Sequence, residues 1–380
     1  MLSGCGDSSW WNKNDKTIEA DQITKLIPSR VNNRASWADD IYAITKQLGI
    51  PQNQENICTI IAVVDQESNF VADPHVPGLG AKAIKEIEDR LDEKFKDKLG
   101  DNIGGTVAGY FQDVLKNQPS PEDNYLKQMR KVSTERELDE LYREIFSYMS
   151  KHYHVSALTG AAKLVGQDIG EKLNPITTLG SMQVHISYAK DHKRQGGNIA
   201  ELRTDLYSQY GGLYYGIHRL MMYPANYDKP IYRFADYNSG MYSSRNAAFQ
   251  SMLNDLMAGE LTLDGDLLLY NKNGNPRAEK SQSENALINV FAANNVFVTP
   301  RQIRSDLKKE KERKFEDTQT YKAVVELFEK KIGKEKIYAI MPEVVISGPK
   351  LSRDYNTNWF ATRVDRRYQT CIQKAKKIKT

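Results

Sequence analysis

Apolar side chains recur at helical spacing along most of the chain. The clearest stripe consists of Ile57, Ile60, Ile61 and Val64, which follow an i, i+3, i+4, i+7 pattern. This spacing places the four side chains on one face of a helix, which is then expected to face the core. The pattern predicts an amphipathic helix from about residue 54 to residue 69.

Helical patterns predominate in the rest of the sequence as well. We expect Ser36 to cap an earlier helix that stops at Gly49. Charged amphipathic segments at 83–99 and 134–151, separated by Gly and Pro breaks, predict a helical insertion over residues 75–165. The fold class is therefore predicted to be mainly α, with little β.

The predicted organisation has three parts. Residues 1–30 are polar and read as a flexible tether, residues 31–260 form the main helical domain with its insertion, and residues 261–380 form an α-rich C-terminal extension packed on that core. This arrangement keeps most of the Gly, Tyr and Met-rich sequence in the middle part.

Composition excludes several classes of protein. Of the 380 residues, 40% are hydrophobic and 27% are charged, which is typical of a globular protein, and no apolar run approaches the length that a membrane span requires. The 53 basic and 49 acidic residues give a net charge of only +4, so we expect no nucleic-acid partner. The 21 Tyr residues outnumber 11 Phe and 4 Trp, which favours polar, sugar-binding clefts.

The N-terminal residues Leu2-Ser3-Gly4-Cys5 resemble the lipobox of bacterial lipoproteins. The resemblance implies lipidation of Cys5 and a membrane anchor. Gly6 in place of Asp implies an outer-membrane lipoprotein, facing the periplasm or the surface. The charged and apolar segments of a signal peptide do not precede the motif, which indicates a trimmed sequence or a start site placed too late. The alternative is a chance occurrence of four residues.

Two cysteines remain if Cys5 carries lipid. Cys58 and Cys371 form an even pair in an oxidising compartment, where disulfides persist, and we predict that they are bonded. The alternative is a pair of buried thiols.

Metal and nucleotide signatures are missing. His152 and His154 supply two ligands without a third at zinc-site spacing, so we expect no metal and no cofactor. The loose dinucleotide pattern at 78–83 follows Pro74 and Pro77, where a buried strand should stand, so it predicts a loop.

Glu67 continues the apolar stripe of the 54–69 helix. Partial burial raises the pKa of a carboxyl group, as a general acid near neutral pH requires. Taken alone, such a Glu at a helix end is more often a solvated side chain.

Four stretches give Glu67 a context, namely Glu67-Ser68-Asn69-Phe70, Gly180-Ser181-Met182-Gln183-Val184, Gly212-Leu213-Tyr214-Tyr215 with Leu220, and Asp236-Tyr237-Asn238-Ser239-Gly240. In this order they resemble the motifs of the soluble lytic transglycosylase and goose-type lysozyme superfamily. The segments 66–70, 73–79 and 230–236 resemble more closely the YaiW-like family of bacterial surface lipoproteins, whose activity is not established. The resemblance to the lytic transglycosylase and goose-type lysozyme superfamily implies a lysozyme-like core over residues 31–260.

The resemblance also implies a reaction. Glu67 would protonate the glycosidic oxygen between N-acetylmuramic acid and N-acetylglucosamine, and would then take the proton of the muramyl 6-hydroxyl to give a 1,6-anhydro product. One carboxylate suffices, because the substrate supplies the nucleophile. The residues expected to bind glycan or shape its site are Ser68, Met182, Gln183, Tyr215, Tyr237 and Asn238. For Tyr214 and Tyr215, simple packing is an equal alternative.

The sequence also departs from the superfamily pattern. A long insertion separates Glu67 from Gly180, Ser181 replaces the usual Leu, and Asp236 replaces the first Ala. If Asp236 lay several ångströms from Glu67, a two-carboxylate hydrolysis would become possible. The predicted partners are peptidoglycan glycan strands and, through the lipid anchor, a membrane. The competing interpretation is a non-catalytic glycan-binding lipoprotein, or one that partners an envelope complex.

Overall fold

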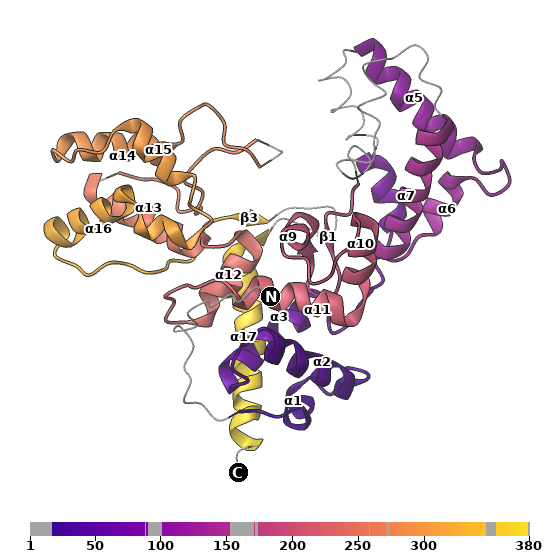
Figure 1. Cartoon of the computed structure of the whole chain (residues 1–380), viewed down its shortest axis with the longest axis horizontal. Coiled ribbons are helices and arrows are strands. Elements are labelled where there is room, and N and C mark those ends of the chain that lie inside the picture. The colour runs from indigo at the N-terminus through magenta and orange to yellow at the C-terminus, as the bar shows by residue number, and fades with distance from the viewer. Residues whose placement is uncertain are drawn as a thin grey trace. The chain divides into compact units, whose positions relative to one another are not determined.

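The structure is a computed structural model. It describes residues 17–378, except residues 88, 90–100, 153–170, 172–173, 258, 272–273 and 347–354. Cys5 and the predicted lipobox therefore lie outside the described residues. In the described part, helices account for nearly all regular structure, beside two antiparallel pairs of two-residue strands (Figure 1). The prediction of a mainly α fold with little β is confirmed.

The chain forms two compact units. Unit 1 comprises Met1–Asn69 and Ile217–Thr380, and unit 2 comprises Phe70–Gly216. The predicted insertion at 75–165 falls inside unit 2. The division does not follow the predicted boundary at residue 260, because the C-terminal helix belongs to the same unit as the N-terminal helices.

Three helices open unit 1, and the last helix of the chain returns to them. They are α1 (Ala20–Leu26), α2 (Arg34–Gln47) and α3 (Gln54–Ser68). The C-terminal helix α17 (Thr357–Ile378) packs against α3 and against α12 (Pro230–Ser239), as Figure 1 shows in yellow. The helix predicted for residues 54–69 is confirmed, and its apolar face is buried.

The other elements of unit 1 are α13 (Ser243–Met257), α14 (Gln282–Ala293), α15 (Pro300–Leu307), η1 (Arg313–Asp317), α16 (Gln319–Ile332), β3 (Val345–Ile346) and β4 (Tyr355–Asn356). One hydrophobic cluster joins α13 through α16. Within it the rings of Phe249, Phe315 and Tyr321 contact one another with centroids 5.2 to 5.4 Å apart. Aromatic packing of this kind fixes the helices in one arrangement.

Unit 2 contains α5 (Asp101–Asn117), α6 (Tyr125–Lys131), α7 (Glu135–His152), β1 (Thr178–Leu179), β2 (Val184–His185), α9 (Ile186–Asp191), α10 (Ile199–Tyr207) and α11 (Gln209–Met221). The last turn of α11 continues into unit 1. The helical character predicted for residues 75–165 agrees with α5, α6 and α7.

Two local predictions need correction. The predicted tether of residues 1–30 extends too far, because Ile23, Leu26 and Ile27 are at most 1% exposed and anchor α1 in unit 1. The second helix begins at Arg34 rather than after Ser36, since Asn33 adopts a left-handed conformation there and takes the N-cap position.

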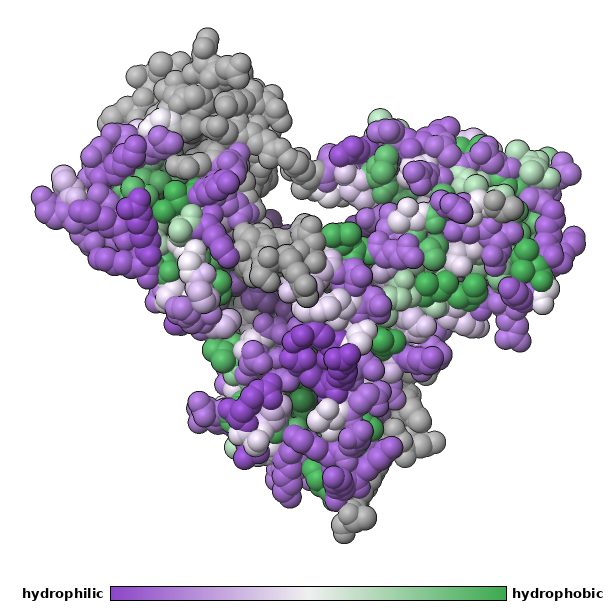
Figure 2. Space-filling view, turned by 180° about the vertical axis from the view of Figure 1, so that it is seen from behind, coloured by the Kyte–Doolittle hydropathy of each residue, from purple (hydrophilic) through white to green (hydrophobic). Residues whose placement is uncertain are grey.

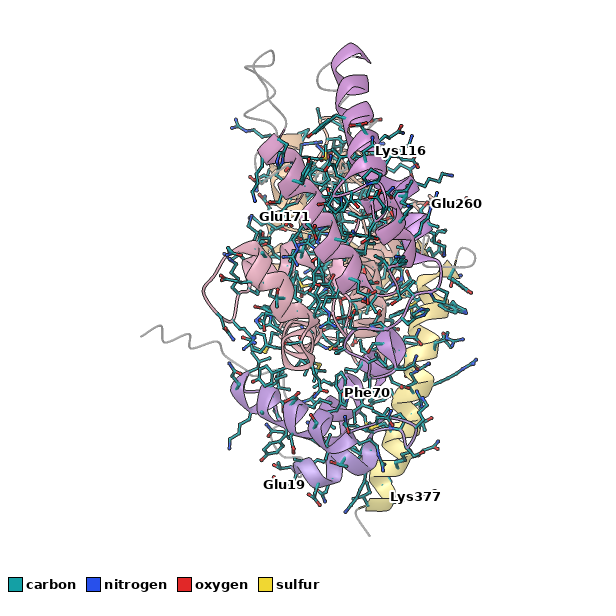
Figure 3. The ribbon with its side chains drawn as sticks, turned by 90° about the vertical axis from the view of Figure 1, so that its right-hand side faces the viewer. Glu19, Phe70, Lys116, Glu171, Glu260 and Lys377 are labelled. Atoms are coloured by element: carbon teal, nitrogen blue, oxygen red, sulfur yellow. A yellow bond between two sulfur atoms is a disulfide. The ribbon has the colours of Figure 1, made fainter. Side chains whose placement is uncertain are left out.

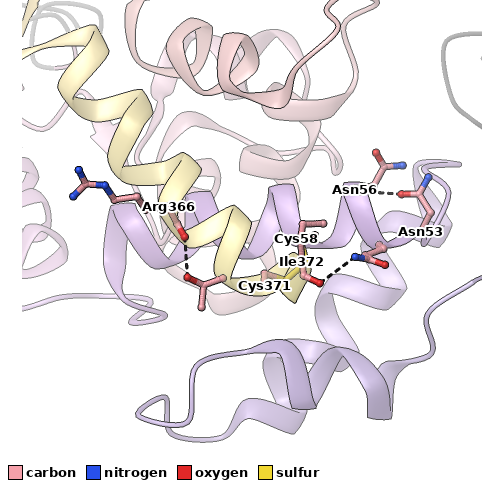
Figure 4. Close-up of a disulfide and its surroundings, with 8 residues drawn as sticks. Asn53, Asn56, Cys58, Arg366, Cys371 and Ile372 are labelled. Carbon is pink, nitrogen blue, oxygen red and sulfur yellow. Dashed lines mark hydrogen bonds between the residues drawn. A yellow bond between two sulfur atoms is a disulfide. The ribbon is translucent and has the colours of Figure 1, made fainter. Parts of the chain in front are cut away.

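Cys58 and Cys371 form a disulfide between α3 and α17, with their Cα atoms 5.5 Å apart (Figure 4). The predicted pairing is confirmed. The Gln54 side-chain amide donates a hydrogen bond to the Ile372 carbonyl at 3.2 Å beside the bridge. Figure 3 shows Glu19, just before α1, and Lys377, near the end of α17, at the same end of unit 1. The two ends of the described chain are thus held in one body.

No helix in the described part of the chain is long and apolar enough to cross a bilayer. On the face shown in Figure 2, hydrophilic side chains alternate with small groups of apolar ones. Such interspersed apolar atoms are ordinary on protein surfaces.

Loss of the disulfide is expected to destabilise unit 1. The bridge joins residues 313 positions apart, and the chain-entropy relation gives an upper value of about 5 to 6 kcal/mol for a loop of this length. A Cys58→Ala/Cys371→Ala variant should therefore show a lower thermal midpoint than the parent, whereas Cys5→Ala should not. Two reactive thiols besides Cys5 in the denatured, unreduced parent would contradict the bridge.

Glu310 is expected to make unit 1 less stable as the pH rises. Burial raises the pKa of Glu310 from its ordinary 4.5 to about 7, although hydrogen bonds from the Tyr270 hydroxyl and the Leu267 N–H act in the opposite direction. Between these two values the unfolded chain has released the proton and the folded chain still holds it, so stability falls by about 3 kcal/mol from pH 5 to pH 8. Urea midpoints should show this loss for the parent and for Glu326→Gln, an exposed control. A Glu310→Gln variant with the same pH dependence as the parent would refute the assignment.

Candidate functional site

Glu67 lies in the last turn of α3, in unit 1. The apolar stripe that precedes it is at most 3% exposed, whereas Glu67 itself is half-buried. The helix ends directly afterwards, because Asn69 and Phe70 adopt φ angles of 51° and 61°. Two consecutive non-glycine residues at positive φ are uncommon and mark a fixed backbone shape. The carboxylate is thus carried on a rigid, anchored helix end.

Ser68 is held by its own helix. Its hydroxyl donates to the Val64 carbonyl at 3.2 Å, and the residue is 5% exposed. This hydrogen bond from one turn to the preceding one uses the only donor of the side chain.

Asp236 is a structural centre of unit 1. The residue is 1% exposed, and its oxygens accept hydrogen bonds from Tyr223 and Tyr227 hydroxyls, from the Ser243 hydroxyl and from the backbone N–H groups of residues 242 and 244. Burial raises the pKa of Asp236, and the hydrogen bonds act against this. The carboxylate thereby closes the turn between α12 and α13, and its acceptor sites are occupied within the unit.

Tyr237 and Asn238 follow on the same helix. The ring of Tyr237, 6% exposed, lies beneath the guanidinium of Arg219, whose Cζ is 4.4 Å from the ring centroid. The Asn238 Oδ1 atom is buried and accepts no hydrogen bond from the residues that the structure describes. A buried amide oxygen without a donor is rare in native proteins and calls for a ligand or a water molecule.

In unit 2, the second and third motifs come together. The turn of Gly180 to Gln183 joins β1 and β2, which pair with Leu179 opposite Val184. A Cβ atom on Gly180 would lie 2.2 Å from the Leu206 carbonyl oxygen, and one on Gly216 of α11 would lie 2.3 Å from Met182. Glycine at these positions lets the turn pack directly on helix backbone.

Gln183 is fixed inside unit 2 at both ends of its amide. The Thr178 hydroxyl donates to Oε1 at 3.1 Å, and Nε2 donates to Glu135 at 3.1 Å and to the Gly180 carbonyl at 3.2 Å. Glu135 is only 2% exposed. These bonds favour the loop-holding role of Gln183 that was one of its two predicted roles.

Tyr215 and Met182 lie in the core of unit 2. They are 1% and 0% exposed, and the Tyr215 hydroxyl accepts a hydrogen bond from the backbone N–H of Arg194 at 3.2 Å. Burial raises the pKa of Tyr215. This geometry favours packing over substrate contact for both side chains.

Comparison with known proteins places the chain in a family. A model of the family described as "Protein of unknown function (DUF1615)" matches residues 30–374. The chain belongs to the DUF1615 family. It is also similar to "Uncharacterized protein YaiW" of Escherichia coli (strain K12), with 32% identity over 381 aligned positions that cover 98% of the chain and 95% of that protein. No solved structure matches the chain. The expected YaiW-like family is confirmed, and the lysozyme-like core stays a prediction.

Sequence reasoning missed two partners of the motif residues in this DUF1615 protein. Glu135 supports Gln183 from 48 positions away, and Arg219 covers Tyr237 from the preceding helix. Neither lies in a motif. Their only sequence signal is a charged residue within an amphipathic helix, which usually indicates a solvated face.

A buried ion cluster in unit 2 was also not predicted from the sequence, because its charged residues lie in amphipathic helices as well. Arg203, with a fully buried side chain, donates to Asp139 at 2.8 Å and to Glu171 at 2.9 Å, and Asn174 donates to Asp139 at 2.6 Å. Among the described residues, no group of three or more His, Cys, Asp or Glu side chains could hold a metal ion. The cluster connects α7 and α10 of the DUF1615 fold.

The contact between Gly216 and Met182 is expected to appear in a double-mutant cycle. Gly216→Ala forces the Met182 side chain to move, which should cost about 1 to 3 kcal/mol. When Met182→Ala is added, the total loss should be smaller than the sum of the two single losses by about 1 kcal/mol or more. Unfolding in urea measures each value. Gly109→Ala, at a position with open space around it, is the control and should not destabilise; strictly additive losses would argue against the contact.

Proposed function

We propose that this protein acts on peptidoglycan as a lytic transglycosylase with Glu67 as its single catalytic carboxyl group. Glu67 donates its proton to the glycosidic oxygen between N-acetylmuramic acid and N-acetylglucosamine. The resulting carboxylate accepts the proton of the muramyl 6-hydroxyl as that oxygen bonds to C1, which gives the 1,6-anhydro product. The observation that carries the proposal is the half-buried Glu67 at the end of a helix whose apolar face is buried, within the ordered set of four motifs.

The position of Glu67 suits a general acid. The C-terminal end of a helix is the negative end of its dipole. In the last turn of α3 a carboxylate is therefore disfavoured, and the protonated acid is favoured. Partial removal from water acts in the same direction. A rigid support is also required for proton transfer in a fixed geometry, and the disulfide at Cys58 anchors the same helix.

The contacts of Asp236 support a mechanism with one carboxylate. A second carboxylate that activates water needs an oxygen free to accept a proton from it. Three of the five hydrogen bonds to Asp236 come from the turn that follows α12, and two come from Tyr223 and Tyr227 before α12; together they give this side chain a structural role.

Tyr237 and Asn238 are the residues that we propose to shape the glycan site in unit 1. The Arg219 guanidinium holds the Tyr237 ring, which is 6% exposed, and the buried Asn238 Oδ1 requires a donor from a water molecule or a ligand.

Ser68 then holds the backbone beside Glu67 in unit 1. In unit 2, Gln183 holds its own loop, and Met182 and Tyr215 pack in the core of that unit.

The protein is further proposed to be an outer-membrane lipoprotein anchored through Cys5. The anchor would keep the enzyme next to the peptidoglycan layer. The competing function is a non-catalytic lipoprotein that binds glycan strands or an envelope protein, and the burial of Met182 and Tyr215 favours it, because these two side chains are not available to a substrate.

Glu67→Gln should abolish the release of anhydro-muropeptides from isolated sacculi. The amide cannot supply the proton, and the loss of a general acid lowers rates by about 100- to 10,000-fold. Protein without the lipid anchor is incubated with sacculi, and products are read by mass spectrometry. The matched control is Glu55→Gln, the same change at an exposed position in the first turn of α3, which should keep the parent activity.

The products decide between the alternatives. Reducing muramyl ends in place of anhydro ends would refute the transglycosylase reaction and favour hydrolysis. If neither parent nor variant releases products while both sediment with sacculi, the enzyme proposal fails and the glycan-binding function takes its place.

A further inference from the structure

A pocket opens in unit 1 beside the disulfide, and Glu67 is not among its lining residues. Its volume is about 560 Å³, and it lies where the segment after α1 meets α3 and α17. Its lining residues are Leu26, Pro28, Ser29, Arg30, Ile61, Asp65, Arg366, Arg367, Thr370, Cys371 and Lys374. A volume of this size fits a small organic ligand.

The pocket carries an excess of positive charge. Four of its lining residues are Arg or Lys and one is Asp, which gives 4 − 1 = +3. The Asp65 carboxylate, 6% exposed, pairs with both Arg30 and Arg367, the latter at 3.0 Å. One buried carboxylate is therefore shared by two guanidinium groups, and it cannot neutralise the other two cations.

Arg366 and Lys374 have no ion-pair partner in the part of the chain that the structure describes. They stand at i and i+8 on α17, with Thr370 between them at i+4, so the three residues form one row along the helix. Figure 4 shows the Arg366 side chain extending outward from α17, away from the bridge. Arg366 is exposed and Lys374 is half-buried, so a ligand that enters the pocket can reach both charges.

Part of the remaining wall is apolar. Leu26 and Ile61 are 1% and 3% exposed, and they line the pocket together with Pro28 and Cys371. A fully hydrated ion would gain nothing from such a wall, whereas a ligand with an anionic group and a short apolar part would use both surfaces.

The walls are held in place before any ligand arrives. The disulfide and the hydrogen bond from Gln54 to Ile372 fix α17 on α3, and Asp65 ties Arg30 and Arg367 to the same helix. A prepared cavity lowers the entropy cost of binding. Guanidinium groups in a fixed position also match the paired oxygens of a phosphate.

We propose that this pocket binds the phosphate group of a small amphipathic phosphate ester. Arg366 and Lys374 provide the charge for the phosphate, with Arg30 and Arg367 already oriented by Asp65, and the Leu26 and Ile61 side receives the apolar part. A phospholipid headgroup with the first part of its chains and a soluble phosphate ester share this chemistry.

Calorimetric titration of the folded chain tests the proposal with two related probes. Dihexanoylphosphatidic acid, below its micelle concentration, and glycerol 3-phosphate carry the same phosphate and differ only in the acyl chains. Arg366→Gln/Lys374→Gln should weaken binding of both probes by about tenfold or more, because the phosphate loses its charge-assisted contacts with both side chains. These substitutions keep the ion pairs of Asp65, and an unchanged thermal midpoint verifies the fold.

The matched control is Arg363→Gln/Lys376→Gln, which removes two exposed charges from α17 outside the pocket lining. It should bind like the parent. Tighter binding of the lipid than of glycerol 3-phosphate supports the proposal with a lipid as the source, and equal binding supports it with a soluble ester. The proposal would be overturned if neither probe bound the parent. It would also be overturned if the pocket variant and the control lost the same affinity for the probes.

Discussion

The packing of α17 against α3 is the constraint on which unit 1 depends. α3 is buried along most of its length, and α17, from the far end of the sequence, supplies the cover together with the Cys58–Cys371 bridge. Asp65 reinforces the same contact by pairing with Arg367. Because α3 also carries Glu67 in its last turn, the side chain to which we assign chemistry stands on a helix that α17 and the disulfide hold in place.

The parts of the fold that follow from local pattern could be predicted. The stripe of α3 is visible because its spacing alone determines which face is buried. α1 was not predicted from the sequence, although Ile23, Leu26 and Ile27 follow the same spacing. Three apolar residues within a polar segment are too short a pattern to indicate a buried helix. The division into units could not be read from the sequence either, since it depends on which distant helix α17 covers.

The candidate site divides in the same way. Motif order drew attention to Glu67, Gln183 and Tyr237, but a motif does not say which side chains stay accessible. Asp236 illustrates the difference: the sequence offered a carboxylate, and the structure surrounds it with donors from the segment before α12 and from the turn after it. Glu135 and Arg219 acquire their importance only through contacts with distant residues or a neighbouring helix. Such pairings depend on tertiary structure, which a single sequence does not display.

The placement of unit 2 within the sequence of unit 1 has a consequence for biosynthesis. All of Phe70–Gly216 leaves the ribosome before the second part of unit 1, Ile217–Thr380, has been made. Unit 2 can therefore begin to fold during translation, whereas α3 must wait for the last helix of the chain before its apolar face is covered. The nascent protein thus carries an incomplete N-terminal part of unit 1 for most of its synthesis, and chaperones that shield apolar helices would act on this part.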